Sequence, residues 1–230
     1  MIKQTRTSKG IIWSVNSESW DDKHFEPSYW QSKNKVIGSA KGRGTTWFVE
    51  HENQQLALRH YYRGGFFGKL IQNTFLYTGE KNLRPLKELK TLHHLARYGV
   101  NVPEPIGARI VKQSIGYTCD ILTKKIQNAQ DLSKLLSSNE LPESMYSRIG
   151  QEIRKMHDSG VNHTDLNIHN ILVDSTAKVW IIDFDKCSQR EGDSWKSDNL
   201  KRLLRSFNKE QTAIRWTTSN WQHLLNGYYN

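Results

Sequence analysis

The chain has 230 residues, of which 36% are hydrophobic, enough for one domain or for two small lobes with a buried core. Lysine and arginine number 33 against 23 aspartate and glutamate residues, and the net charge of +10 favours anionic partners. We expect neither a signal peptide nor a membrane-spanning helix, because no apolar stretch is long enough for either. The two cysteines, Cys119 and Cys187, lack a metal-binding spacing and indicate a reducing compartment.

The N-terminal part predicts an aromatic-rich extension followed by strands. Residues 1–35 are expected to pack against the first lobe, with Pro27 in the first turn of a short helix. Residues 40–49 predict a strand, a turn with two glycines, and a second strand. Glycines at 42 and 44 would let backbone N–H groups approach a triphosphate, although a plain hairpin turn explains the pattern equally well. Residues 56–62 predict a further strand, which leads into a basic loop.

The middle of the chain predicts one helix and a pair of strands. Between Pro85 and Tyr98, apolar residues recur at helical spacing, namely Leu86, Leu89, Leu92 and Leu95. Gly99 ends this helix. Strands are expected at 108–111 and 117–122, and residues 122–126 would form the hinge between two lobes.

The C-terminal part predicts mainly helices, which span residues 129–137, 142–159 and 196–207. The helix over 196–207 contains two arginines, Arg202 and Arg205. The final helix presents an apolar face, formed by Trp221, Leu224, Leu225 and Tyr228.

Polar residues at the open end of a predicted β-hairpin form the main candidate site. Residues 171–173 and 179–182 read as its two strands, so the hairpin brings Asn170 beside Asp183. Amide and carboxylate oxygens are ligands that Mg²⁺ accepts, and Mg²⁺ usually shares its shell with substrate phosphates. We therefore predict Asn170 and Asp183 as metal ligands and Asp165, in the preceding loop, as the catalytic residue of a phosphoryl transfer.

The spacing matches the protein-kinase pattern H-x-D-L-x-x-x-x-N followed by D-F-G. The matching positions are His163, Asp165, Leu166, Asn170, Asp183 and Phe184. The chain thus resembles the protein-kinase-like superfamily, which implies an α+β fold with two lobes. The expected arrangement is a single domain over 1–230, with an antiparallel sheet and one main helix in an N-lobe (about 1–122). A mostly helical C-lobe (about 127–230) would follow.

The kinase pattern also implies residues that bind ATP. Arg59 occupies the position of the phosphate-binding lysine, with Arg63 and Lys69 as substitutes. Glu88 is expected to hold this cation, although pairing with a neighbouring lysine on the same helix is nearly as plausible. The turn expected to steady the ATP phosphates consists of Gly42, Arg43, Gly44 and Thr45.

Three departures from the kinase pattern favour an acceptor other than a protein. Thr164 replaces the arginine of H-R-D, Asp185 replaces the glycine of D-F-G, and no A-P-E follows. A separate departure, Trp47 at the third glycine of the glycine-rich loop, bears on how far that loop reaches over the phosphates. The short stretch after Asp185 leaves little room to bind a peptide, and a sugar needs less.

Several strings resemble the 3-deoxy-D-manno-octulosonic acid (Kdo) kinases, a family of lipopolysaccharide core kinases. These strings are residues 42–47, 58–65, 99–105, 120–123 and 163–167. The resemblance implies ATP-dependent phosphorylation, with Mg²⁺, of the 4-hydroxyl of Kdo on a Kdo-bearing lipid A precursor. It also implies a peripheral protein on the cytoplasmic face of the bacterial inner membrane. Anionic lipid would be a partner, assisted by the net charge.

Other interpretations remain open at this point. The fold would also suit a kinase for an inner-core heptose, an aminoglycoside or another small alcohol. A non-catalytic kinase-like module is conceivable because of Trp47 and Arg59. Nucleic-acid binding is not expected, since the basic residues are spread along the chain, and we expect a monomer. The loop with Phe66 and Phe67 and the Trp221 face are apolar candidates for membrane insertion.

Overall fold

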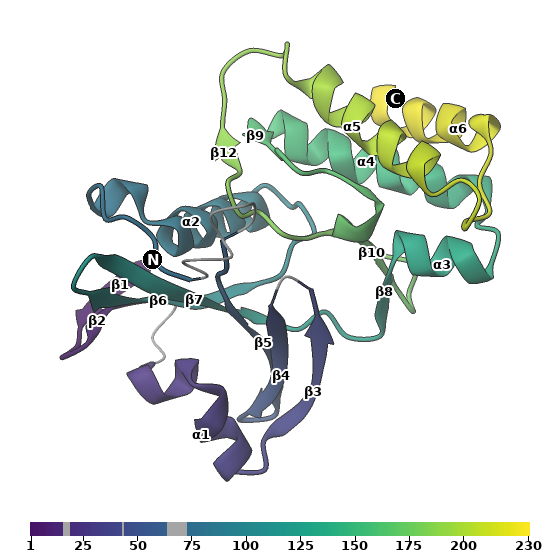
Figure 1. Ribbon diagram of the computed structural model, residues 1–230. Helices are drawn as coiled ribbons and strands as arrows, with labels where there is room; N and C mark the ends of the chain where they lie inside the picture. The colour runs from purple at the N-terminus through teal and green to yellow at the C-terminus, as the bar shows by residue number, and fades with distance from the viewer. Residues whose placement is uncertain (16–18, 43, 64–72) are drawn as a thin grey trace. The chain divides into compact units, whose positions relative to one another are not determined.

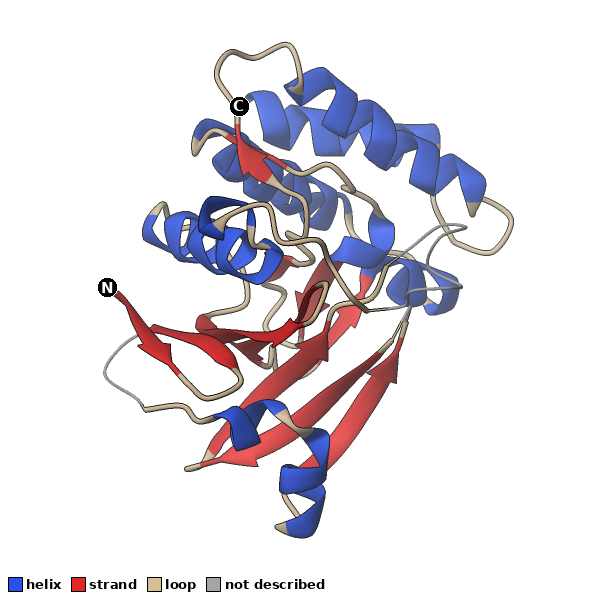
Figure 2. Ribbon diagram, turned by 60° about the vertical axis from the view of Figure 1, so that its left-hand side comes forward, coloured by secondary structure: helices blue, strands red, loops and turns tan. Residues whose placement is uncertain are grey.

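The computed structural model (Figure 1) describes residues 1–15, 19–42, 44–63 and 73–230. The chain divides into two compact units. Unit 1 comprises Met1–Lys90 and Glu104–Lys125, and unit 2 comprises Thr91–Pro103 and Ile126–Asn230. Figure 2 distinguishes the strands, which dominate unit 1, from the helices, which dominate unit 2.

Unit 1 is built on a seven-stranded antiparallel sheet with the strand order β1-β2-β6-β7-β5-β4-β3. The strands are β1 (Ile2–Arg6), β2 (Gly10–Val15), β3 (Val36–Lys41), β4 (Thr45–His51), β5 (Gln54–His60), β6 (Pro105–Gln113) and β7 (Gly116–Lys124). The strands expected near residues 40–49, 56–62, 108–111 and 117–122 are confirmed. Strands β4, β6 and β7 contain β-branched or aromatic residues that favour the extended backbone.

The N-terminal extension differs from the expectation in its first half. Residues 2–15 form two strands of the sheet, and β2 is buried along its whole length against β6. The second half does pack as expected, through the 3-10 helix η1 (Asp22–Phe25) and helix α1 (Pro27–Ser32). The core of the unit includes Ile12, Trp20, Phe25, Trp30, Val49, Leu56, Leu58, Ile106 and Leu122. Burial of these side chains supplies the main stabilising free energy of unit 1.

Helix α2 (Arg84–Arg97) follows the short 3-10 helix η3 (Glu80–Asn82). Its predicted apolar face is confirmed, because Leu86, Leu89, Leu92 and Leu95 are buried. The division between the two units falls within this helix, after Lys90.

Unit 2 combines helices with two small sheets. The helices are α3 (Leu132–Ser138), α4 (Glu143–Asp158), η4 (Ile168–Asn170), α5 (Lys196–Lys209) and α6 (Thr218–Tyr229). One sheet contains β8 (Ala129–Asp131), β10 (Ile171–Asp174) and β11 (Val179–Ile181), and the other contains β9 (Val161–Asn162) and β12 (Ser188–Gln189). Among the described helices, none combines the length and apolar character that crossing a bilayer requires.

The helix expected over 129–137 begins three residues later than the sequence predicts. Residues 129–131 pair with β10 instead, and the helix begins at Leu132. The Asp131 side chain caps the helix by accepting a hydrogen bond from the Lys134 N–H at 3.0 Å. An aspartate at the N-cap satisfies a backbone donor that has no partner inside the helix, which fixes the start at this point.

Helices α4 and α6 approach each other backbone to backbone. A Cβ atom on Gly150 of α4 would lie 2.0 Å from the Leu224 carbonyl oxygen, and one on Gly227 of α6 would lie 2.0 Å from the Ser147 carbonyl oxygen. Only glycine fits at such distances. Trp221 of α6 is buried, so it belongs to the packed core and is not presented for membrane insertion.

Candidate active site

His163 anchors the loop that contains the predicted catalytic residue. Its imidazole is fully buried and lies against the Phe184 ring, with 4.9 Å between ring centroids. Nδ1 accepts a hydrogen bond from the Asp165 N–H at 3.3 Å, and Nε2–H donates to the Ile182 carbonyl at 2.9 Å. Burial lowers the pKa of His163, which favours the neutral ring that can accept at one nitrogen and donate at the other. The imidazole therefore ties the loop to the strand that precedes Asp183.

The Asp165 carboxylate is partly exposed to solvent, and hydrogen bonds from two asparagine side chains hold its backbone carbonyl. The Asp165 carbonyl accepts hydrogen bonds from Asn167 Nδ2 at 2.8 Å and from Asn170 Nδ2 at 2.9 Å. An amide that donates through nitrogen in this way directs its oxygen elsewhere, where it can serve as a ligand atom. The loop thus fixes both the predicted base and one predicted metal ligand.

Asp183 lies at the end of the hairpin that the sequence predicted. The Ile182 N–H donates to the Asn170 carbonyl at 3.0 Å, so Asn170 and Asp183 are brought together as expected. Asp183 has φ of +62°, a left-handed conformation that costs free energy in a residue other than glycine. The buried Phe184 ring and the anchored Ile182 hold this conformation from both sides.

The chemistry of the two predicted ligands, Asn170 and Asp183, is compatible with Mg²⁺. Among the described residues, no cluster of three or more histidine, cysteine, aspartate or glutamate side chains could hold a metal ion. One carboxylate and one amide oxygen fit Mg²⁺, which binds through few protein ligands and completes its shell with water and phosphate oxygens.

Helix α5 and its C-cap residue support the candidate catalytic loop, residues 163–170, through three hydrogen-bonding contacts. The His163 N–H donates to Asn199 Oδ1 at 3.0 Å, and the Ile168 N–H donates to Ser206 Oγ at 3.1 Å. At the end of the helix, Glu210 Oε1 lies 2.7 Å from His169 Nε2. Sequence reasoning missed these supporting residues, although their spacing along one helical face was visible in the sequence.

A second layer of buried polar groups lies beneath Asn199. Asn199 Nδ2 donates to Asn162 Oδ1 at 2.7 Å, and its oxygen also accepts from His157 Nε2–H at 3.3 Å. The Tyr228 hydroxyl donates to His157 Nδ1 at 2.7 Å. Burial is the main cause that lowers the pKa of His157, to about 4, so the ring is neutral near pH 7. Both hydrogen bonds of His157 therefore match a neutral imidazole, which donates at Nε2 and accepts at Nδ1.

Arg202 of α5 lies beside the predicted base. Its Nη1 is 3.5 Å from Asp165 Oδ1, and both side chains are 46% exposed. An ion pair this exposed contributes little to stability, so its location matters more than its strength.

In unit 1, the structure pairs the predicted phosphate-binding cation with the predicted glutamate. Arg59 Nη2 donates to Glu88 Oε1 at 2.5 Å, and the Tyr61 hydroxyl donates to Glu88 Oε2 at 2.5 Å. The Glu88 side chain is 4% exposed, and a buried carboxylate needs such charged and polar donors. Tyr61 is a further residue that the sequence did not reveal, and burial together with the Glu88 charge raises its pKa.

The predicted phosphate turn joins β3 to β4 in the same unit. The Gly42 N–H donates to the Gly44 carbonyl at 2.8 Å, and Arg43 lies outside the described residues. A Cβ atom on Gly44 would lie 2.1 Å from the Tyr62 ring, so packing alone explains a glycine at this position. Thr45 is the first residue of β4, and Thr46, the second, pairs with Arg59 of β5. The turn and Arg59 therefore lie at the same end of the sheet.

The remaining predicted residues are the two alternatives to Arg59 as the phosphate-binding cation and the apolar loop proposed for membrane insertion. The Arg63 guanidinium lies over the Phe75 ring, 5.6 Å from its centroid. Lys69, Phe66 and Phe67 lie outside the described residues.

Comparisons with known proteins identify the family of the chain. Residues 27–228 match the lipopolysaccharide kinase (Kdo/WaaP) family. A 3-deoxy-D-manno-octulosonic acid kinase of Vibrio parahaemolyticus is 53% identical over 221 residues, which cover 94% of this chain and 92% of the relative. A protein of the same description from Mannheimia succiniciproducens is 44% identical over 240 residues and is matched over 100% of both chains.

A solved structure of WaaP in complex with acyl carrier protein has the same fold. Its TM-score is 0.59 at 15% sequence identity, with 89% of this chain and 86% of that chain covered. This likeness confirms the α+β kinase-like fold that the sequence predicted, with an antiparallel N-terminal sheet and a helical C-terminal part. Because the family match extends over most of its length, the chain belongs to the lipopolysaccharide kinase (Kdo/WaaP) family.

Proposed function

We propose that this chain transfers the γ-phosphate of ATP to the 4-hydroxyl of Kdo on a Kdo-bearing lipid A precursor, in lipopolysaccharide core synthesis. The observation that supports phosphoryl transfer best is the gathering of Asp165, Asn170 and Asp183 by one loop and one hairpin. The Kdo kinases that share about half of its residues support the acceptor.

In the proposed reaction, Asp165 orients the acceptor hydroxyl and takes its proton. The oxygen–phosphorus bond to Kdo forms as the bond between the γ-phosphorus and the bridging oxygen of ADP breaks. Asn170 and Asp183 would hold Mg²⁺, which neutralises charge on the phosphate oxygens when it is bound. The Gly42–Thr45 turn and Arg59 would steady the phosphates, and Glu88 would keep the Arg59 guanidinium in place.

The test is an acceptor panel with mass spectrometry. Purified protein, ATP and Mg²⁺ are incubated with Kdo-bearing lipid A precursor, with an inner-core heptose acceptor and with an aminoglycoside. We expect a gain of one phosphate on the Kdo acceptor alone, and fragmentation should place it on O4. Transfer only to heptose or to the aminoglycoside would reject the acceptor, and ATP binding without any transfer would favour a non-catalytic module.

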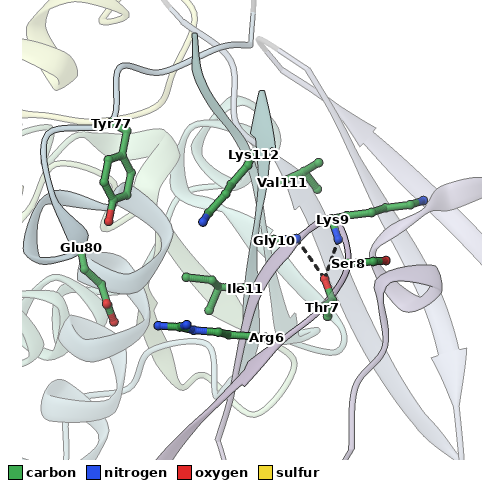
Figure 3. A pocket seen from close by; sticks show the side chains of 10 residues that line it. All are labelled: Arg6, Thr7, Ser8, Lys9, Gly10, Ile11, Tyr77, Glu80, Val111 and Lys112. Carbon is green, nitrogen blue, oxygen red and sulfur yellow. Dashed lines mark hydrogen bonds between the residues drawn. The ribbon is translucent and has the colours of Figure 1, made fainter. Parts of the chain in front are cut away.

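We further propose that the protein attaches peripherally to the cytoplasmic face of the inner membrane, because the proposed acceptor is a lipid. A pocket of about 460 Å³ in unit 1 supports this proposal (Figure 3). The side chains of Arg6 and Lys112 extend into it toward Tyr77 and Glu80. Cations near an anionic bilayer contribute about 1 kcal/mol each to attachment.

Exposed apolar side chains lie next to this basic pocket. Ile115 is 74% exposed and Leu76 is 65% exposed. An isolated bridge between Phe75 and Tyr117 places residues 75–77, which include Leu76, beside the turn that contains Ile115. A surface with cations and exposed apolar side chains fits the interfacial region of an anionic membrane.

Vesicle co-sedimentation tests this attachment. We expect binding to anionic vesicles that weakens as salt rises, and a loss of binding in Arg6→Gln/Lys112→Gln. The matched control is Lys134→Gln, which removes an exposed lysine of α3, an element that does not line this pocket. Equal binding to zwitterionic vesicles, or binding that persists unchanged in molar salt, would contradict an electrostatic attachment.

A further inference from the structure

The cation next to Asp165 is held at a defined position in the fold. Arg202 lies on α5 between Asn199 and Ser206, and both of these residues are hydrogen-bonded to the catalytic loop. These contacts fix the register of the helix against the loop, so the Arg202 side chain emerges beside the Asp165 carboxylate. If Arg202 were only part of a solvated basic face of α5, its position beside Asp165 would not need to be fixed by the Asn199 and Ser206 contacts.

The geometry of the pair leaves Arg202 able to bind a second anion. A guanidinium has five N–H donors in a planar fork, and the contact with Asp165 is a single one at 3.5 Å. Because almost half of each side chain is exposed, an acceptor can reach both groups. Arg205 is one turn further along α5 and is also exposed, which adds a second positive charge on this part of the helix.

We propose that Arg202, assisted by Arg205, binds the carboxylate of an acidic sugar acceptor and presents its hydroxyl to Asp165. This inference rests on the proposed function, because Kdo is a sugar acid. Arginine binds carboxylates through two parallel hydrogen bonds, which fixes direction as well as position. The same residues would discriminate between acceptors, since a neutral heptose gains nothing from them and a polycationic aminoglycoside is repelled.

A purely structural role for Arg202 makes a different prediction. If the guanidinium only holds Asp165 in place, its loss lowers turnover equally for every acceptor. If it binds the acceptor carboxylate, the loss is confined to acceptors that have one. The two roles are therefore separated by changing the acceptor as well as the protein.

The experiment compares Kdo with its C1 carboxamide as acceptors for wild type, Arg202→Gln and Lys201→Gln. Lys201 is the matched control, because it is the preceding residue of α5 and is paired with Asp198 near solvent. We expect wild type to prefer the acid in kcat/KM by about 10- to 100-fold, the effect of hydrogen bonds between charged groups. Arg202→Gln should lose this preference mainly through KM for the acid. Lys201→Gln should keep it.

Equal losses of Arg202→Gln on both acceptors would overturn the inference, and so would an unchanged preference for the acid. A binding measurement separates this from failure of the proposed function. Thermal stabilisation of the protein by free Kdo, present in wild type and absent in Arg202→Gln, would support the carboxylate site even if no phosphate were transferred. Phosphorylation of Kdo without any dependence on Arg202 would leave the proposed function intact and reject the site.

Discussion

Acid should destabilise unit 2 through His157, the buried histidine that supports Asn199. Burial lowers the pKa of His157 to about 4, whereas an unfolded chain has a value near 6.5. Between these two values the unfolded state binds more protons than the folded state, so the free energy of unfolding falls as pH falls. The stabilising contribution is complete above about pH 6.5. It decreases by about 2 kcal/mol on going from about pH 7 to about pH 5.

Urea denaturation at several pH values measures this effect. His157→Gln keeps an amide donor for Asn199 but cannot take up a proton, so its free energy of unfolding should depend less on pH by about 2 kcal/mol over the same interval. Tyr228→Phe is the control, because it removes one hydrogen bond to His157 and leaves the burial that lowers its pKa. A wild-type pH dependence in His157→Gln would refute this reasoning.

Three further variants test the packing and the site. Asn199→Ala should lower the free energy of unfolding by roughly 3 kcal/mol, because it leaves buried groups of the catalytic loop unpaired, and a loss confined to turnover would contradict this. Gly150→Ala should lower it by about 1–3 kcal/mol in denaturant titrations, because its Cβ would meet the Leu224 carbonyl. Its control, Ser144→Ala on the exposed face of α4, should have little effect. Arg59→Met should raise KM for ATP about tenfold, as expected for one lost charge-assisted contact, and an unchanged KM would remove Arg59 from the nucleotide site.

Local sequence spacing was sufficient to predict the loop over residues 163–170 and the hairpin that follows it. Asp165, Asn170 and Asp183 lie within twenty residues, and the strands between them follow a recognisable pattern. The pairing of Arg59 with Glu88 was also predictable, because the kinase pattern relates the two positions. The left-handed conformation of Asp183 could not be predicted, because nothing in an aspartate requires a positive φ.

Contacts between distant residues could not be predicted from periodicity. The apolar spacing of residues 196–207 indicates a helix, but it does not show that Asn199 binds a loop 36 residues earlier. Membership of β1 and β2 in the sheet likewise depends on pairing with β6, which lies almost a hundred residues away. The start of α3 was predictable in principle, because Asp131 followed by Leu132 is an N-cap signal.

The most direct test of the account is the rate of phosphate transfer from ATP to Kdo-bearing lipid A precursor by wild type and Asp165→Asn. We expect wild type to add one phosphate, and the variant to be slower by about 10²- to 10⁴-fold, the usual effect of losing a general base. Thermal unfolding should be nearly unchanged, because the Asp165 side chain is half exposed and its backbone makes the anchoring contacts. Turnover near the wild-type rate in Asp165→Asn would contradict the central claim.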